Sequence, residues 1–221
     1  MFLLLAGRLS CAAGGTMEYT GYGANRSVSG ALHVLTLDGE TVILDAGSFY
    51  DATVPLPLPP ELVSHARAVV VSHAHLDHTG RLIPLVRSGF QGPIHTTPPT
   101  RELLPVMLDM ASRFGDFGGE TFYLSRQGRT VHLYPDCRGG VRISAGNRRE
   151  ITTARSKLQE QKLLICRQCA DRDVQAVLTL VRPSPLHAKI AIGQSLEAEY
   201  FHSSHLPGAA TTLLRGTKSG L

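Results

Sequence analysis

Alternating apolar and polar positions predict several strands in the first third of the chain. Residues 32–37 and 41–44 form two such segments. Between them, Asp38 and Gly39 supply the positive φ angles that a two-residue hairpin turn requires. The run 66–71 is almost continuously apolar and β-branched, which favours a buried strand.

Helical spacing of apolar residues predicts four helices in other parts of the chain. They are expected through 82–86, over 101–113, from 151 to 164 and from 174 to 181. The helix over 101–113 is expected to tolerate an internal proline and to bury one apolar face, formed by Leu103, Leu104, Met107 and Met110. Residues 196–200 alternate instead, which predicts a half-buried strand leading towards His205.

Length and composition indicate one domain with a substantial core. The chain has 221 residues, of which 43% are hydrophobic. We interpret residues 1–16 as a leader or upstream extension without a role in the fold, and residues 17–221 as the domain. Within it, 115–165 reads as a variable insertion, and the proline-rich stretch 54–60 as an extended connection. The apolar stretch at 2–6 is too short to span a membrane.

Charge and cysteine content exclude few binding partners or functions. The formal net charge of +4 is compatible with a polyanionic partner without requiring one. The four cysteines, at 11, 137, 166 and 169, are too few and too irregular for a disulfide scaffold, which favours a reducing cytoplasm. Cys166 and Cys169 form a lone CxxC, which is weak evidence for a structural zinc site because no second pair completes four ligands.

The segment richest in possible metal-binding side chains lies directly after the apolar run 66–71. The six residues from His73 to His78 contain three imidazoles and a carboxylate, in the order His-Ala-His-Leu-Asp-His. Residues two apart on extended chain project to the same side, so His73 and His75 can bind one ion together. Asp77 and His78 follow where the chain leaves the strand. Imidazole nitrogen and carboxylate oxygen are ligands that zinc accepts, so the segment predicts a metal site.

This motif, with the strand-end sequence 42–47 before it, resembles the metallo-β-lactamase superfamily. Residues 17–30 and 92–100 are similar to segments of its RNA-processing branch, the β-CASP nucleases related to the polyadenylation-factor endonuclease. Residues 205–210, His-Leu-Pro-Gly-Ala-Ala, resemble the third-ligand segment of that branch, although Ser204 stands where the family usually has glycine. The resemblance implies an α/β fold, the αββα sandwich, and phosphodiester hydrolysis of RNA with zinc as cofactor.

The resemblance also assigns roles to individual residues. His73, His75 and His205 would hold the first of one or two zinc ions, and Asp77 and His78 would contribute to a second. Asp77 would also orient the attacking water and accept its proton. Asp45 would orient a ligand histidine by accepting its far N–H. His202 is the nearest alternative to His205, and the remaining histidines are expected to be surface or hydrogen-bonded residues: His33, His65, His95, His132 and His187.

The family pattern continues with an Asp that bridges two metals and with a further histidine, and neither follows His205 here. We therefore expect the N-terminal portion of the fold, with most of the second sheet missing and an apolar face uncovered. Such a chain is expected to bind about one zinc ion, to be poorly soluble or oligomeric, and to hydrolyse phosphodiesters weakly.

Two other functions fit the same sequence. One is a thioester or lactone hydrolase of the glyoxalase II kind. The other is a catalytically inactive fragment that acts as a scaffold, for example by docking on a full-length relative. The basic residues Arg148, Arg149, Arg155 and Lys157 could contact phosphate, but a solvated helix face accounts for them as well.

Overall fold

The computed structural model describes residues 5–10, 16–24, 30–48, 60–115, 117, 119–153 and 155–218. A seven-stranded mixed sheet forms its centre, in the order β1-β2-β3-β4-β5-β6-β11. From β1 to β4 each pair of neighbouring strands is antiparallel, and from β4 through β5 and β6 to β11 each pair is parallel. Its strands are β1 (Leu5–Ser10), β2 (Thr16–Gly21), β3 (His33–Leu37), β4 (Glu40–Leu44), β5 (Ala66–Val70), β6 (Ile94–Thr96) and β11 (Val181–Pro183).

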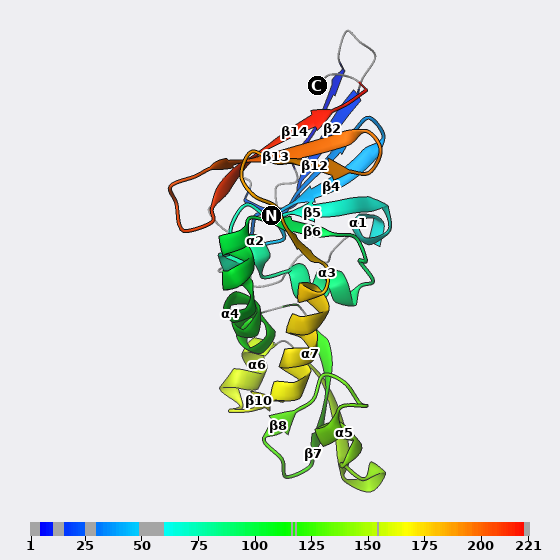
Figure 1. Ribbon diagram of the computed structural model, residues 1–221. Coiled ribbons are helices and arrows are strands. Elements are labelled where there is room, and N and C mark those ends of the chain that lie inside the picture. Colours follow the sequence, from blue (N-terminus) through cyan, green and yellow to red (C-terminus); the bar gives the residue numbers. More distant parts are fainter. Residues whose placement is uncertain are drawn as a thin grey trace.

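Helices cover one face of this sheet and a second sheet covers the other (Figure 1). The helices are α1 (Pro60–His65), α2 (Leu76–Thr79), α3 (Leu82–Arg87), α4 (Pro98–Phe114) and α7 (Arg167–Leu178). The second sheet is antiparallel and consists of β12 (Lys189–Ile192), β13 (Leu196–His202) and β14 (Ala210–Gly216).

Alternation along β5 explains the layered arrangement. Val69 and Val71 point into the core beneath the helices, and Ala68 and Val70 point into the core beneath the second sheet. Successive side chains of a strand face opposite sides, so the continuous apolar run 68–71 must be buried on both. The expected αββα class is therefore seen as three of its layers within the described residues.

The second sheet covers the face that was expected to be bare over strands β3 to β5. Ile190, Leu196, Ala198 and Tyr200 pack there against the central sheet. Its outward face is polar, with ion pairs between Lys189 and Glu197 and between Arg215 and Glu199. The predicted alternation of residues 196–200 is confirmed, because the apolar positions are buried and both glutamates are half-buried.

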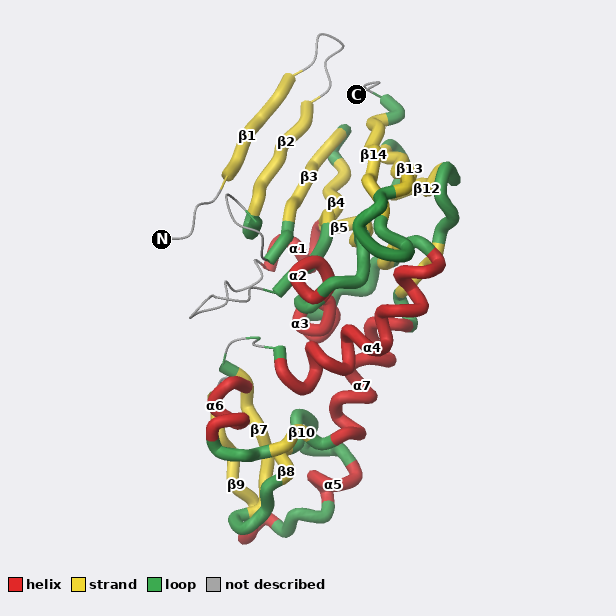
Figure 2. The backbone as a smooth tube through the Cα atoms, turned by 90° about the vertical axis from the view of Figure 1, so that its left-hand side faces the viewer, coloured by secondary structure: helices red, strands yellow, loops and turns green. Residues whose placement is uncertain are grey.

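An inserted unit lies beyond the helix layer, at the bottom of Figure 1 and of Figure 2. It is made of short elements between α4 and α7: β7 (Glu120–Ser125), β8 (Thr130–Val131), α5 (Arg138–Val141), the 3-10 helix η1 (Ala145–Asn147), β9 (Arg148–Thr153), α6 (Arg155–Glu160) and β10 (Leu164–Ile165). β7 pairs with β9, and β8 pairs with β10. A small core of its own is centred on Phe122, Leu124, Val131 and Leu158.

Three predictions of local structure need correction. The helix expected from 151 to 164 is wrong over its first part, because residues 148–153 pair with β7 as strand β9 and only 155–160 are helical. On α4 the buried apolar residues are Leu104, Leu108 and Ala111, because these face α7 and the sheet, whereas Leu103 and Met110 are exposed. Residues 5–10 form β1 and extend the sheet at β2, which gives them a place in the fold.

The predicted hairpin is confirmed. Strands β3 and β4 are joined by Asp38 and Gly39, both with positive φ. The proline-rich stretch 54–60 lies outside the described residues apart from Pro60, which begins α1. No helix within the described ranges is both long and apolar enough for a membrane span.

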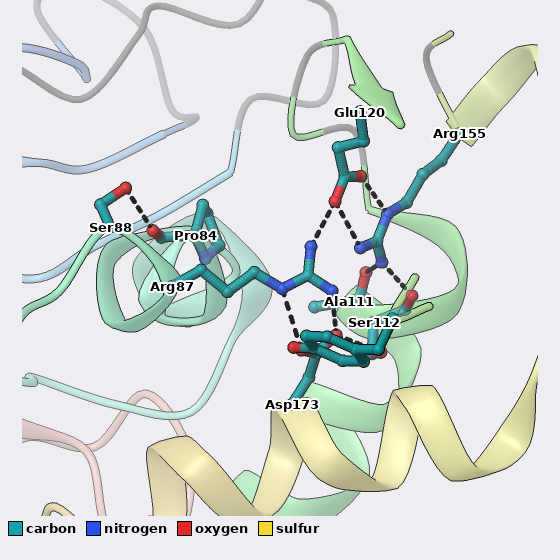
Figure 3. Close-up of polar contacts among 9 residues, drawn as sticks. Pro84, Arg87, Ser88, Ala111, Ser112, Glu120, Arg155 and Asp173 are labelled. Carbon is teal, nitrogen blue, oxygen red and sulfur yellow. Dashed lines mark hydrogen bonds and ion pairs between the residues drawn. The ribbon is translucent and has the colours of Figure 1, made fainter. Parts of the chain in front are cut away.

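Paired charges attach the inserted unit to the helix layer (Figure 3). Arg87 of α3 donates to Asp173 of α7 and to Glu120 of β7. Glu120 also accepts from Arg155 of α6, with Nε and Oε2 2.5 Å apart. The Arg155 side chain is fully buried and also donates to the carbonyl of Ser112. The prediction of a solvated Arg155 is therefore wrong, since its charge is neutralised inside the protein.

Glu40, the first residue of β4, connects the two sheets. Its buried carboxylate accepts hydrogen bonds from the backbone N–H groups of Gln194 and Ser195, at 2.9 and 2.7 Å, and from the Ser195 hydroxyl at 3.0 Å. Burial alone would raise the pKa of Glu40, but these hydrogen bonds and the nearby Arg67 outweigh it. The pKa therefore lies below its ordinary value of 4.5.

Replacement of Glu40 by Gln is expected to lower the free energy of unfolding by about 1–3 kcal/mol at pH 7, because a charged acceptor of several hydrogen bonds is lost. The folded pKa is depressed, so this stabilisation is present above the unfolded pKa and is lost as the pH falls through the folded value. Urea unfolding should therefore show the difference between wild type and E40Q shrinking below about pH 4. The exposed Glu102, replaced by Gln, is the control. An E40Q variant as stable as E102Q at pH 7 would contradict this role.

Candidate metal centre

Three imidazoles from the two sheets meet at one edge of the molecule. His73 follows β5, His75 lies at the N-terminus of α2, and His205 lies in the loop between β13 and β14. One ring nitrogen from each can be chosen so that all three lie within 4.8 Å of one another. Their ring centroids are 4.8 to 5.0 Å apart, and Nδ1 of His75 lies 3.2 Å from Nε2 of His205.

One ring nitrogen of His73 has no hydrogen-bond partner in the described structure. Its Nδ1 is 3.0 Å from the Ser72 hydroxyl, whereas its Nε2 is buried without a hydrogen-bond partner among the described residues. Burial is the main cause and the neighbouring His78 a second one, and together they lower the pKa of His73 to about 4. The ring is therefore neutral at pH 7, which is the form that binds a metal. A buried, unpaired acceptor is costly, and a metal ion would satisfy it.

Asp45 holds the start of the histidine segment. Its carboxylate accepts from the backbone N–H and the hydroxyl of Ser72, at 2.7 and 2.8 Å. It also lies 2.7 Å from Nδ1 of His78. Burial alone would lower the pKa of His78, but the hydrogen bond and charge of Asp45 outweigh it and raise the pKa. The contact orients the His78 ring, with Nε2 turned towards Asp77 at 3.6 Å.

Backbone contacts lock the segment that follows β4 against the turn at 76–78. The N–H groups of Ala31 and Ala46 donate to the carbonyls of Asp77 and His78. Gly47 lies so close that a Cβ built on it would be 1.6 Å from the Asp77 carbonyl oxygen. Only glycine allows this approach.

The His205 loop is fastened by residues that sequence reasoning did not single out. The hydroxyls of Thr97 and Thr100, at the start of α4, lie 2.5 and 3.0 Å from the carbonyl oxygen of Gly208. After this loop, the N–H of Ala210 donates to the Ser72 carbonyl at 2.9 Å. The sequence signal was the pair of threonines flanking two prolines, which marks a helix start but not its partner 108 residues away.

The other predicted histidines fall outside this cluster. His202 is exposed on β13 and does not share a ligand group with His73 and His75 in the described part of the chain. His65 and His187 are exposed, and His33 is hydrogen-bonded to the Tyr19 hydroxyl at 2.7 Å. His95 is buried, and neither of its ring nitrogens has a hydrogen-bond partner among the described residues.

Comparison with known proteins decides the family. The family model described as Metallo-beta-lactamase superfamily matches residues 29–149, more than half of the chain. The chain belongs to this superfamily. The histidine segment 73–78 lies inside the matched range, and His205 lies beyond it.

Curated relatives of this metallo-β-lactamase chain carry names from RNA metabolism. It is 38% identical over 112 residues to Ribonuclease TTHA0252 of Thermus thermophilus. The aligned region covers 47% of this chain and 25% of the relative. It is 30% identical over 108 residues to Transcription termination factor FttA of Methanosarcina mazei, covering 45% of the chain and 17% of the relative. It is 36% identical over 93 residues to Endoribonuclease YSH1 of Saccharomyces cerevisiae, covering 40% and 12%. These matches thus span a quarter or less of each relative's length.

Replacement of Gly47 by Ala tests the packing behind the histidine segment. The added Cβ would overlap the Asp77 carbonyl, so we expect the free energy of unfolding to fall by about 3 kcal/mol. Gly146 is the matched control, because a Cβ built there meets nothing within 4 Å. Urea unfolding should place G146A within about 0.5 kcal/mol of wild type. Equal stability of the two variants would show that the turn at 76–78 can move away at little cost.

Proposed function

We propose that this chain carries the metal centre of a zinc-dependent hydrolase that cleaves RNA phosphodiester bonds. The observation that carries the proposal is the convergence of His73, His75 and His205, with one ring nitrogen of His73 buried and unpaired among the described residues. Three neutral imidazoles are a ligand set that catalytic zinc uses, and they leave a fourth position open. The names of the curated relatives support RNA as the substrate.

In this proposal each residue has a defined role. A bound zinc ion supplies Lewis acidity and lowers the pKa of water. His73, His75 and His205 hold it, and the Asp77 carboxylate orients the attacking water and accepts its proton. Asp45 accepts the Nδ1–H of His78 and so keeps Nε2 free for a second ion, which Asp77 would share. Binding of a second ion by Asp77 and His78 is a prediction.

Two further parts of the proposal concern the surroundings of the protein. Cys137, Cys166 and Cys169 are unpaired thiols, which supports a location in the reducing cytoplasm. Association with a second copy or with a full-length relative, expected from the sequence, remains a prediction.

Hydrolysis of a labelled single-stranded RNA, with and without added zinc, tests the function. We expect zinc-dependent cleavage that chelation abolishes. Replacement of His205 by Ala should reduce the rate of cleavage. The reduction should exceed the roughly 10–100-fold loss that is typical when a residue hydrogen-bonded to a metal ligand is replaced. His202 replaced by Ala is the matched control, because it is an exposed histidine of the preceding strand, and it should retain activity.

Three results would contradict the proposal. Absence of RNA cleavage by protein that holds zinc would favour the inactive scaffold. Turnover of S-lactoylglutathione in place of RNA would favour the glyoxalase II kind of enzyme. Loss of activity in H202A with retention in H205A would show that His202 is the third ligand and His205 is not.

Removal of the Thr97 and Thr100 hydroxyls tests whether the start of α4 positions His205. Replacement of both by Val deletes the hydrogen bonds to Gly208, and we expect zinc affinity at the histidine cluster to fall about 10-fold. Competition with a chromogenic chelator measures it. Thr121 and Thr152, an exposed hydrogen-bonded pair on β7 and β9, are replaced by Val as the control. Unchanged affinity in the first variant would show that the loop is held by other contacts.

A further inference from the structure

A second group of metal-binding side chains lies in the inserted unit, away from the histidine cluster. His132 follows β8, Cys137 precedes α5, Cys166 precedes α7, and Cys169 lies in the first turn of α7. One ligand atom from each of the four lies within 4.8 Å of the others. His132, Cys137 and Cys169 are buried, and Cys166 is half-buried. The CxxC that lacked a second pair in the sequence thus finds two further donors in the fold.

We propose that His132, Cys137, Cys166 and Cys169 form a structural zinc site. Three thiolates and one imidazole make a complete tetrahedral ligand set, which leaves no position for water or substrate. This closed set separates the site from the three-histidine cluster, where a position stays open. The inference does not depend on the proposed RNA hydrolysis.

The distance between two of the sulfurs suits a zinc ion better than a disulfide. Tetrahedral bonds of about 2.3 Å place two zinc-bound sulfurs about 3.8 Å apart. Sγ of Cys137 and Sγ of Cys166 are 3.9 Å apart, which matches this distance. Nδ1 of His132 is within hydrogen-bond range of Sγ of Cys137, at 3.0 Å. A disulfide needs the sulfurs at about 2.05 Å, and it would engage only two of the three thiols.

Backbone N–H groups are already aimed at two of the sulfurs. Gly139 and Gly140 donate to Cys137, and Leu133 and Tyr134 donate to Cys169. Such donors favour the thiolates that a metal requires. In Cys169 they oppose the effect of burial, which raises the pKa of that thiol. Cys166 and Cys169 lie at the N-terminus of the 12-residue helix α7, whose dipole adds to this effect.

The turn that carries Cys137 is shaped around the histidine ring. A Cβ built on Gly139 would lie 2.3 Å from Cε1 of His132, so glycine is required where the ring packs. The N–H of Cys166 donates to the Val131 carbonyl at 2.8 Å, which places the first cysteine of the CxxC beside the residue preceding His132. The four donors therefore approach from two chain segments that are joined by backbone contacts.

A zinc ion at this place would compensate for the small core of the inserted unit. Among its described residues, the buried apolar cluster consists of Phe122, Leu124, Val131 and Leu158, and small units of this kind commonly need a metal or disulfides. Cys169 lies in α7 and Cys166 is the N-cap of this helix, which packs against α3 and α4. The site would fix the unit to the helix layer, beside the ion pairs of Arg87 and Asp173 seen in Figure 3.

Metal analysis and cobalt substitution of the purified chain test the proposal. Wild-type protein reconstituted with cobalt should show a thiolate-to-cobalt charge-transfer band and the visible absorption of tetrahedral cobalt. The band should persist in H205A, which alters the histidine cluster, and disappear in C166S. Zinc content should fall by about one ion per chain in C166S, because a closed site holds one ion. C11S, which changes the cysteine outside the proposed site, should match wild type.

The wild-type spectrum decides the matter even if C166S fails to fold, because the three-histidine cluster contains no thiol. A cobalt-loaded wild type without thiolate charge transfer would overturn the proposal. So would protein isolated with iron in place of zinc at the cysteines, or thiol titration that finds a disulfide among Cys137, Cys166 and Cys169. Zinc loss in C11S equal to that in C166S would do the same.

Discussion

The hydrogen bond from the N–H of Ala210 to the Ser72 carbonyl joins the two sheets where each carries a histidine towards the same point. Ser72 is fixed on its other side by Asp45, which accepts from both its N–H and its hydroxyl. One residue thus connects the end of β4, the end of β5 and the start of β14. The positions of His73 and His205 follow from this junction, because each lies within a few residues of it.

Burial at this junction of the two sheets determines the protonation state of His73. His73 is removed from water by the packing of two sheets, so its ring stays neutral and one nitrogen is left without a partner in the described structure. In the same region, the close approach of the Asp77 carbonyl requires glycine at position 47. Asp45 orients the His78 ring by a hydrogen bond. Residues that stabilise the fold here also define the ligand geometry, so their effects on stability and on metal binding are coupled.

Sequence patterns revealed the parts of this arrangement that depend on local spacing. The segment 73–78 lies within one motif, and the alternation of 196–200 reveals which strand leads to His205. The contact of Thr97 and Thr100 with Gly208 could not be predicted, because no local pattern encodes the partner of a hydroxyl more than 100 residues away. The apolar spacing from 151 to 164 suggested one helix, but pairing with β7 made residues 148–153 a strand.

The inserted unit shows more clearly that local sequence patterns do not predict contacts between distant residues. His132 and Cys137 carry no recognisable spacing relative to the CxxC at 166–169, and only the pairing of β8 with β10 brings them together. Arg155 looked like a solvated basic residue, yet Glu120 and the Ser112 carbonyl make its burial possible. Charges and thiols in this unit find partners through tertiary structure, which hydrophobic periodicity does not report.

Anomalous diffraction at the zinc absorption edge, from crystals of zinc-loaded protein, tests the central claim most directly. The account predicts a peak at the junction of the sheets with imidazole nitrogens of His73, His75 and His205 each about 2.0–2.1 Å from it. A peak that His73 and His75 coordinate while the His205 ring lies outside coordination distance, or the absence of a peak there, would contradict it.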